Sequence, residues 1–220
     1  ELPKNISVIV KMGFGYNHRF HRAMIKAKKI IDNNDIGELM FMRSRYGHGG
    51  RLGYENEWRS NPEISGGGEL IDQGSHLIDL TRFFLGNIID HKSVVKTCFW
   101  DMKVDDNAFM ILTTEKQKIS FLHASCSEWK NTFSLEIYGK TGKIEINGLG
   151  GSYGVEKITL FKMRKEMGPP DVISWEYLTE DDSWKVELNN FFLFLENKPN
   201  EIAKMEDAIA SMKIIKQLYE

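Results

Sequence analysis

The feature that most constrains the fold is a run of strand-like segments in the second half of the chain, joined by short links. β-branched and aromatic residues gather in stretches that are separated by glycine, asparagine and charged residues, a pattern typical of strands and turns. The expected strands are residues 94–100, 108–114, 119–126, 133–138, 143–146, 158–161 and 172–177. Links such as residues 115–118 and 139–142 are too short for a parallel crossover, which needs about a dozen residues or more. The sequence therefore predicts mostly antiparallel pairing.

The first half of the chain alternates between strand and helix patterns. Alternation predicts strands over residues 7–16 and 38–46, the second with Leu39, Phe41 and the aliphatic part of Arg43 on one face and Met40, Met42 and Ser44 on the other. Apolar residues at helical spacing predict helices over residues 21–33, 69–85, 184–196 and 206–219. Together these elements predict an α+β fold, with an open, mostly antiparallel sheet and helices on one face, in a single domain spanning residues 1–220.

Composition narrows the functional class. The 220 residues carry a formal net charge of -2, which favours neither a nucleic-acid partner nor an anionic membrane. No apolar run approaches the roughly 20 residues that cross a bilayer. Cys98 and Cys126 lie in apolar, strand-like stretches without CxxC or zinc spacing, so we expect reduced core thiols, no metal site and a cytoplasmic protein. The aromatic run of Phe191, Phe192 and Phe194 is expected in the core.

The sharpest candidate for chemistry is residues 65–79, SGGGELIDQGSHLID. Asp72 and His76 would lie one turn apart on the predicted helix, with Asp79 on the other side of the imidazole. Two flanking carboxylates would raise the pKa of His76 from about 6.5, which suits a general acid or base that moves a hydroxyl proton. The triple glycine would let another molecule approach the backbone closely. The alternative is an Asp–His pair on a solvated helix face.

A second candidate is the segment GYNHRFH at residues 15–21, which lies between a predicted strand and a predicted helix. Side chains at a strand's end often meet ligands. Tyr16, Asn17, His18 and Arg19 offer hydrogen bonds to hydroxyl or phosphate groups. The alternative is a polar helix cap with surface charge.

The third candidate is the long loop GHGGRLGYENEWRSNPE at residues 47–63. A loop of this length in a compact domain commonly lines or covers a site. Arg51 and Arg59 could grip a phosphate or carboxylate, which hints at an anionic substrate such as a nucleotide sugar. Tyr54 and Trp58 could stack on a sugar or nicotinamide ring. The alternative is an ordinary surface loop anchored by one tryptophan.

Taken together, these segments resemble the C-terminal domain of the glucose-fructose oxidoreductase/inositol dehydrogenase (Gfo/Idh/MocA) family. The resemblance rests on GYNHRF, the EWR turn, SGGGELIDQGSHLID, VDDNAFMIL, LEIYGKTGKIEI and EDAIASMKII, and covers nearly the whole chain in the family's order. It implies an open sheet of about nine strands, like the C-terminal domain of glyceraldehyde-3-phosphate dehydrogenase. The exposed face of such a sheet would form a homodimer or homotetramer.

The resemblance also implies hydride transfer between NAD or NADP and a hydroxyl-bearing carbon of a sugar, cyclitol or nucleotide sugar. His76 would transfer the proton and Asp72 would orient the substrate or relay the proton. The substrate-binding residues would be Tyr16, Asn17, Arg19, Trp58, Arg59 and Gln73. Trp58 and Arg59, on the turn near the nicotinamide in the family, are the candidates for cofactor contact.

Two family features are missing from this sequence. No GxGxxG follows the strand–turn–helix order of a Rossmann domain, and ELPK at residues 1–4 lies too close to GYNHRF to be the family's lysine motif. Because the chain also opens on Glu1, we expect a fragment of a longer enzyme. The alternative is a non-catalytic sugar-binding or dimerisation module. A metal hydrolase, the third reading, would need a bound ion.

Overall fold

The computed structural model describes residues 10–220, which form one open sheet with its helices on one side. The strands are β1 (Leu39–Gly47), β2 (Ile88–Lys96), β3 (Asn107–Thr114), β4 (Ile119–Ser125), β5 (Thr132–Gly139), β6 (Gly142–Asn147), β7 (Glu156–Lys162) and β8 (Asp171–Tyr177). Their order across the sheet is β2-β3-β4-β1-β5-β6-β7-β8. Every neighbouring pair is antiparallel except β1 and β4. The α+β prediction is confirmed, with eight strands in place of about nine.

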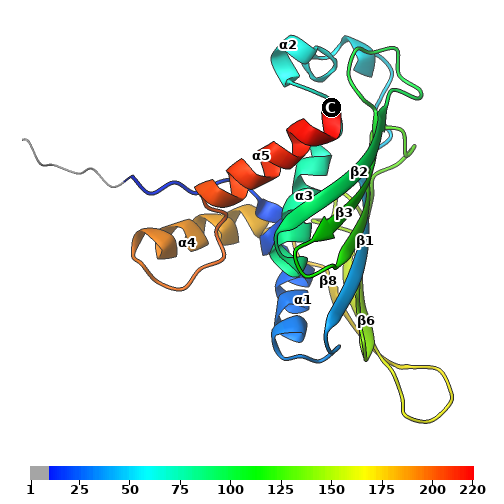
Figure 1. The fold of residues 1–220 in the computed structure, drawn as a ribbon, viewed down its shortest axis with the longest axis vertical. Coiled ribbons are helices and arrows are strands. Elements are labelled where there is room, and N and C mark those ends of the chain that lie inside the picture. The colour runs from blue at the N-terminus through cyan, green and yellow to red at the C-terminus, as the bar shows by residue number, and fades with distance from the viewer. Residues whose placement is uncertain (1–9) are drawn as a thin grey trace, which may run out of the picture.

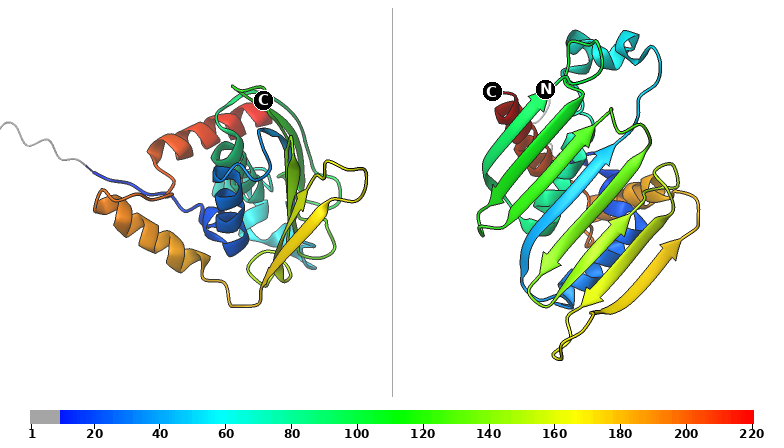
Figure 2. Two further views of the ribbon diagram at one scale, coloured as in Figure 1. Left: turned by 90° about the horizontal axis from the view of Figure 1, so that it is seen from below. Right: turned by 90° about the vertical axis from the view of Figure 1, so that its right-hand side faces the viewer.

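The helices gather on one face of this sheet and leave the other face open (Figure 1; Figure 2, right). They are α1 (Arg22–Asp32), α2 (Pro62–Ser65), α3 (Gln73–Leu85), α4 (Ser183–Leu195) and α5 (Met205–Tyr219). Helix α3 packs against β1 and β4 at the centre, α1 against β6, β7 and β8, and α5 against β2. None of the helices in this part of the chain combines the length and apolar composition that a bilayer crossing requires.

The core lies between the sheet and these helices because side chains of the central strands alternate between the two faces, most regularly on β5. On β5, Phe133, Leu135 and Ile137 are buried toward the helices, while the intervening side chains are partly exposed on the open face. The apolar side of α3, with Leu77 and Ile78, completes the same cluster. A period of two in the strands and of 3.6 in the helix therefore meets at one interface.

Three expectations about the strands are wrong: one strand is absent, one begins earlier, and one has a bulge. Residues 10–16 form no strand beyond a single bridge between Phe14 and Ala203, because no neighbouring strand is available to pair with them; residues 7–9 lie outside the described part of the chain. Strand β2 begins at Ile88, six residues before the expected start at Val94. A bulge between Leu39 and Phe41 turns Leu39 toward the core. Leu39 therefore lies on the same side of the sheet as Met42 and Ser44, and not on the side of Phe41 as predicted.

Two expectations about the core also need correction. Cys126 is buried but Cys98 is exposed, although both thiols are free as expected. Phe192 is half-exposed on α4, which is the helix farthest from the sheet in both side views (Figures 1 and 2). The aromatic run therefore lies outside the main core, because α4 packs against residues 17–20 and not against the sheet. These residues belong to the segment GYNHRFH at 15–21, which is called the entry segment below.

The glycine-rich turn before α3 is held by one carboxylate at the start of β3. Asp105 accepts hydrogen bonds from the backbone N–H groups of Gly68 (3.0 Å) and Leu70 (2.8 Å) and from the Tyr219 hydroxyl (2.8 Å). The Asp105 carbonyl accepts a further bond from the N–H of Glu69. The backbones approach so closely that a Cβ atom on Gly68 would lie 1.9 Å from that carbonyl oxygen. Only glycine fits at this position.

Replacing Gly68 with alanine should therefore lower the free energy of unfolding by about 2 kcal/mol or more, since the turn must move away from Asp105. Urea unfolding followed by circular dichroism measures this loss. Gly15→Ala is the control, because its Cβ would meet nothing within 4 Å. Equal stability of the two variants would contradict this description of the turn.

Candidate active site

Helix α3 begins at Gln73, so Asp72 precedes the helix and does not lie within it. The expectation of a pair at i and i+4 on one helix is therefore wrong in its geometry. The Asp72 side chain is half-exposed, and its carboxylate lies 3.5 Å from the Arg59 guanidinium. The turn formed by Gly66, Gly67 and Gly68 places this carboxylate at the rim of the cavity that His76 lines.

His76 lies inside the first turn of α3 and lines a polar cavity of about 410 Å³. Its ring packs on the His18 ring, with centroids 4.0 Å apart and planes inclined by 30°. The Nδ1 atom of His76 is buried and has no hydrogen-bond partner among the described residues. Burial lowers the pKa of His76 to about 4, Asp72 opposes this shift, and His21 adds to it. The expected rise in pKa is wrong, because loss of solvent outweighs the nearby carboxylate.

Asp79 does not flank His76 as predicted but binds Arg19 in a buried ion pair. Two guanidinium nitrogens of Arg19 donate to the two Asp79 oxygens, at 2.8 and 2.5 Å. Such a two-point pair fixes the entry segment against α3. The expectation that Arg19 binds the substrate is not supported, since its charged group is engaged by Asp79 and by the Glu201 carbonyl and does not line the cavity of His76.

The rest of the entry segment is also turned into the protein. Asn17 is buried and donates from Nδ2 to the Ser183 hydroxyl at 3.0 Å. Tyr16 is buried with its ring edge toward His76, at 5.9 Å between centroids. Neither residue lines the cavity that contains His76. Tyr16, Asn17 and His18 therefore support the imidazole from behind.

Of the predicted site residues, His76, Asp72, Gln73 and Arg59 come together in the cavity. The loop candidates Arg51 and Tyr54 line it as well, and the rest of the wall comes from Tyr46, His48, Gly50, Glu57, Asn131 and Tyr153. Tyr46, Asn131 and Tyr153 were missed, because β1, the loop before β5 and the loop after β6 meet only through the sheet. Nothing local in the sequence distinguishes them from other surface polar residues.

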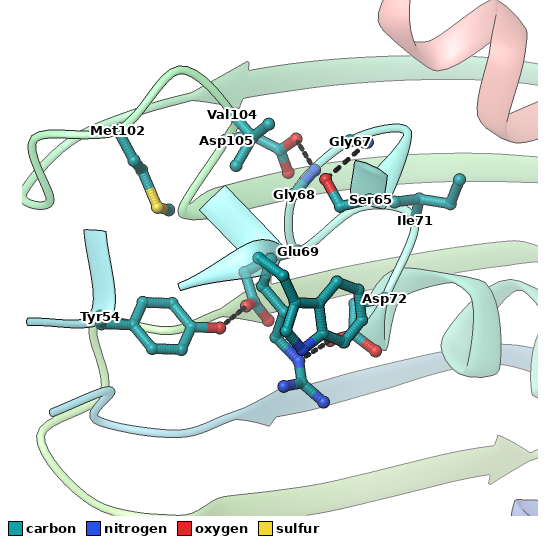
Figure 3. Close-up of a pocket in the computed structure, with 12 residues that line it drawn as sticks. Tyr54, Ser65, Gly67, Gly68, Glu69, Ile71, Asp72, Met102, Val104 and Asp105 are labelled. Atoms are coloured by element: carbon teal, nitrogen blue, oxygen red, sulfur yellow. Dashed lines mark hydrogen bonds and ion pairs between the residues drawn. The ribbon is translucent and has the colours of Figure 1, made fainter. Parts of the chain in front are cut away.

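A smaller cavity of about 220 Å³ adjoins the first across Tyr54, Arg59 and Asp72, which line both. Figure 3 shows the Glu69 carboxyl group in its wall, directed toward the Tyr54 hydroxyl. Trp58, the other predicted ring-stacking residue, lines this smaller cavity with its side chain half-exposed. The guanidinium of Arg59 lies 4.5 Å from the centre of the Trp58 ring.

The two arginines of the loop already have carboxylate partners. Arg51 contacts Glu57 at 2.8 Å, and Arg59 contacts Asp72 at 3.5 Å. Both pairs lie in the wall of the larger cavity. Their positive charges are therefore largely compensated before any ligand enters.

The described residues fit one end of a dinucleotide. The exposed indole of Trp58 offers a flat face for a nicotinamide ring, and the buried Gln73 Oε1 and His76 Nδ1 atoms lack protein partners beside the larger cavity. In residues 10–220 the single parallel strand pair is β1 and β4, so this stretch contains no Rossmann unit for the phosphates. Nor does it hold a cluster of three or more His, Cys, Asp or Glu side chains placed for a metal ion.

The chain is similar to known proteins in sequence and in fold. The family model described as "GFO/IDH/MocA C-terminal domain" matches residues 24–145. Glucose-6-phosphate 3-dehydrogenase of Bacillus subtilis (strain 168) is 23% identical over 100% of this chain and 66% of that protein. Glucose-fructose oxidoreductase domain-containing protein 1 of Mus musculus is 34% identical over 84 residues, which cover 38% of this chain and 20% of that protein.

Solved structures share the fold. Levoglucosan dehydrogenase in complex with NADH superposes with a TM-score of 0.83 at 19% identity, over 96% of this chain and 63% of that one. The aldose-aldose oxidoreductase of Caulobacter crescentus, complexed with glycerol, has a TM-score of 0.78 at 20% identity, over 95% of this chain and 61% of that one. The chain thus spans less than two thirds of the length of each of these relatives.

The depressed pKa of His76 predicts that the protein loses stability as the pH falls. Unfolded histidine takes up a proton near pH 6.5, whereas folded His76 does so near pH 4, so between these values the unfolded state binds more protons. Burial lowers the pKa of His18 in the same direction. The free energy of unfolding should thus fall by about 1–2 kcal/mol per buried imidazole from pH 7 to pH 5. Urea unfolding at both values measures it.

His76→Gln should remove part of that fall, because glutamine does not titrate. His91→Gln, which removes an imidazole from β2 far from the cavity, is the control. An identical pH dependence in wild type and His76→Gln would contradict the burial of this imidazole.

Proposed function

Because this chain belongs to the GFO/IDH/MocA family through its C-terminal domain, we propose that it is the substrate-binding part of an NAD(P)-dependent oxidoreductase acting on a sugar or cyclitol hydroxyl. The observation that carries the proposal is the neutral imidazole of His76 in the wall of a polar cavity, beside the carboxylate of Asp72. A neutral imidazole can accept a proton, which a protonated one cannot. The names of the relatives, which include sugar dehydrogenases and an NADH complex, support the same assignment.

The chemistry needs a hydride acceptor and a base. A bound nicotinamide would supply the acceptor for the hydride of the carbon that bears the hydroxyl group. His76 takes the hydroxyl proton as the C–H bond breaks, so that the alcohol becomes a ketone and the imidazole becomes charged. The stacked ring of His18 holds the His76 ring in place. Asp72 lies close enough to stabilise the positive charge that forms on His76, because its coulombic effect favours the protonated imidazole.

The polar wall orients the substrate. Tyr46, Tyr153, Gln73 and Asn131 bring hydroxyl and amide groups to the wall of the larger cavity, which His76 also lines. A sugar or cyclitol carries several hydroxyl groups that can both donate and accept, so a wall of this kind suits it. Trp58 and Arg59, at the edge of the smaller cavity, are the side chains we assign to contact with the nicotinamide.

His76→Gln should lower turnover by about 10²-fold in the complete protein, since removal of a general base costs roughly that factor. Initial rates of NAD(P)H formation with a panel of sugars and cyclitols measure the effect. His91→Gln on β2 is the matched control. Turnover that survives in His76→Gln would contradict the role of His76 as the base, whereas a wild type without turnover would favour a non-catalytic sugar-binding or dimerisation module.

We also assign the open face of the sheet to contact with a second copy of the chain. This face carries exposed apolar side chains on neighbouring strands, among them Phe109 and Ile111 on β3 and Ile119 and Phe121 on β4. Phe41 and Tyr138 stack beside them on β1 and β5. A continuous apolar area of this kind is uncommon on a monomer. Figure 2, right, shows the strands of this face in front with the helices behind them, so a second copy can reach it.

Light scattering should therefore give a molar mass of at least twice 25.4 kDa for the chain. Phe121→Glu should shift it to a single copy, because a buried unpaired charge is costly at an apolar interface. Phe192→Glu, on α4 at the opposite side of the molecule, should leave the mass unchanged. A wild-type mass of one copy would contradict the assignment.

A further inference from the structure

Glu69 carries a buried carboxylate with no strong partner. Its side chain is almost wholly enclosed, at 2% exposure, between the triple glycine and α3. The Oε1 atom lies 3.4 Å from the Tyr54 hydroxyl and 3.6 Å from Nε2 of His48. The Oε2 atom is buried without a hydrogen-bond partner among the described residues. The carboxylate therefore has capacity for at least one more donor.

His48 is held so that it presents a donor, and not an acceptor, toward this carboxylate. The backbone N–H of Gly50 donates to Nδ1 of His48 at 3.0 Å, which makes Nδ1 an acceptor. In a neutral imidazole the proton then sits on Nε2, which faces Glu69. The Tyr54 hydroxyl and Nε2 of His48 therefore both direct donors toward the Glu69 carboxyl group, which favours its form as an acceptor.

A buried carboxylate without enough hydrogen-bond donors raises the free energy of the folded protein, unless a further donor binds to it. A buried charge or polar atom normally has hydrogen-bond partners, and native proteins retain few exceptions. Burial raises the pKa of Glu69, and His48 opposes this rise. Glu69 lines the smaller cavity, and His48 lines the larger one beside His76. Because the two cavities adjoin across Tyr54, Arg59 and Asp72, a substrate that extends from His76 into the smaller cavity would meet the carboxyl group of Glu69.

The charges around the two cavities exclude one class of substrate. Their walls contain the carboxylates of Glu57, Glu69, Asp72 and Asp105 and the guanidiniums of Arg51 and Arg59. Each guanidinium contacts a carboxylate, which partly offsets its positive charge. A phosphate group would therefore meet an excess of negative charge, whereas a hydroxyl group would find acceptors.

From this arrangement we propose that Glu69, positioned by His48 and Tyr54, accepts a hydrogen bond from a substrate hydroxyl, and that the cavity selects an unphosphorylated sugar over a sugar phosphate. The inference rests on the proposed function. It revises the expectation from the sequence that Arg51 and Arg59 hold an anionic substrate. A hydrogen bond to an ionised carboxylate is among the strong ones, so one such bond can set specificity.

The test compares wild type and Glu69→Gln in the complete protein with its cofactor. Initial rates are measured with levoglucosan and D-glucose as the unphosphorylated probes and with glucose 6-phosphate as the charged one. Wild type should have at least tenfold higher kcat/KM for the better unphosphorylated sugar than for glucose 6-phosphate. Glu69→Gln should raise KM for that sugar about tenfold with a smaller change in kcat. The ratio of kcat/KM between that sugar and glucose 6-phosphate should therefore become smaller than in wild type.

Glu63→Gln removes a carboxylate outside both cavities and should leave the preference unchanged. Glu69→Asp, which keeps the charge, should restore part of the preference, a rescue that a purely structural role would not produce. A wild-type preference for glucose 6-phosphate, or an unchanged KM in Glu69→Gln, would overturn this inference alone. No turnover with any of the three sugars, and no binding of them by calorimetry, would overturn the proposed function and the inference with it.

Discussion

The site depends on the carboxylate of Asp105. This one side chain accepts hydrogen bonds from the turn before α3 and from the last turn of α5. It therefore joins the loop, the central helix and the C-terminal helix at the start of β3. The close packing of the Gly68 backbone on Asp105 leads the chain into α3 with Glu69 facing inward and Asp72 facing the cavity rim. Without this contact the two carboxylates and His76 would have no defined relation to one another.

Burial then gives two ionisable groups opposite properties from one cause. Removal of water disfavours the charged form of any group, so it lowers the pKa of His76 and raises the pKa of Glu69. For His76 the result is a neutral imidazole near pH 7 that can take a proton. For Glu69 the result is a carboxylate whose charge is costly unless donors surround it. Both effects suit a cavity that recognises hydroxyl groups and removes a proton from one of them.

The architecture separates two tasks between the faces of the sheet. The helical face forms the core, and the cavities lie beside the N-terminal end of α3. The open face carries aromatic and aliphatic side chains that no helix covers. The Arg19–Asp79 pair binds residues 17–20 to α3, and His18 in this segment packs against the His76 ring. A substitution on the open face can therefore change association without reaching the cavity.

Local pattern in the sequence determined the elements: the alternation in β3 to β8, the amphipathic helices and the glycine-rich turn were predictable because each depends on residues within a few positions. His76 and Asp72 were predicted as a pair for the same reason. Only the tertiary structure decided the pKa of His76, the pairing of Arg19 with Asp79, and the meeting of Tyr46, Asn131 and Tyr153 in one wall. Those properties depend on burial and on contacts between residues far apart in the chain, and neither of these can be recognised from local periodicity in the sequence.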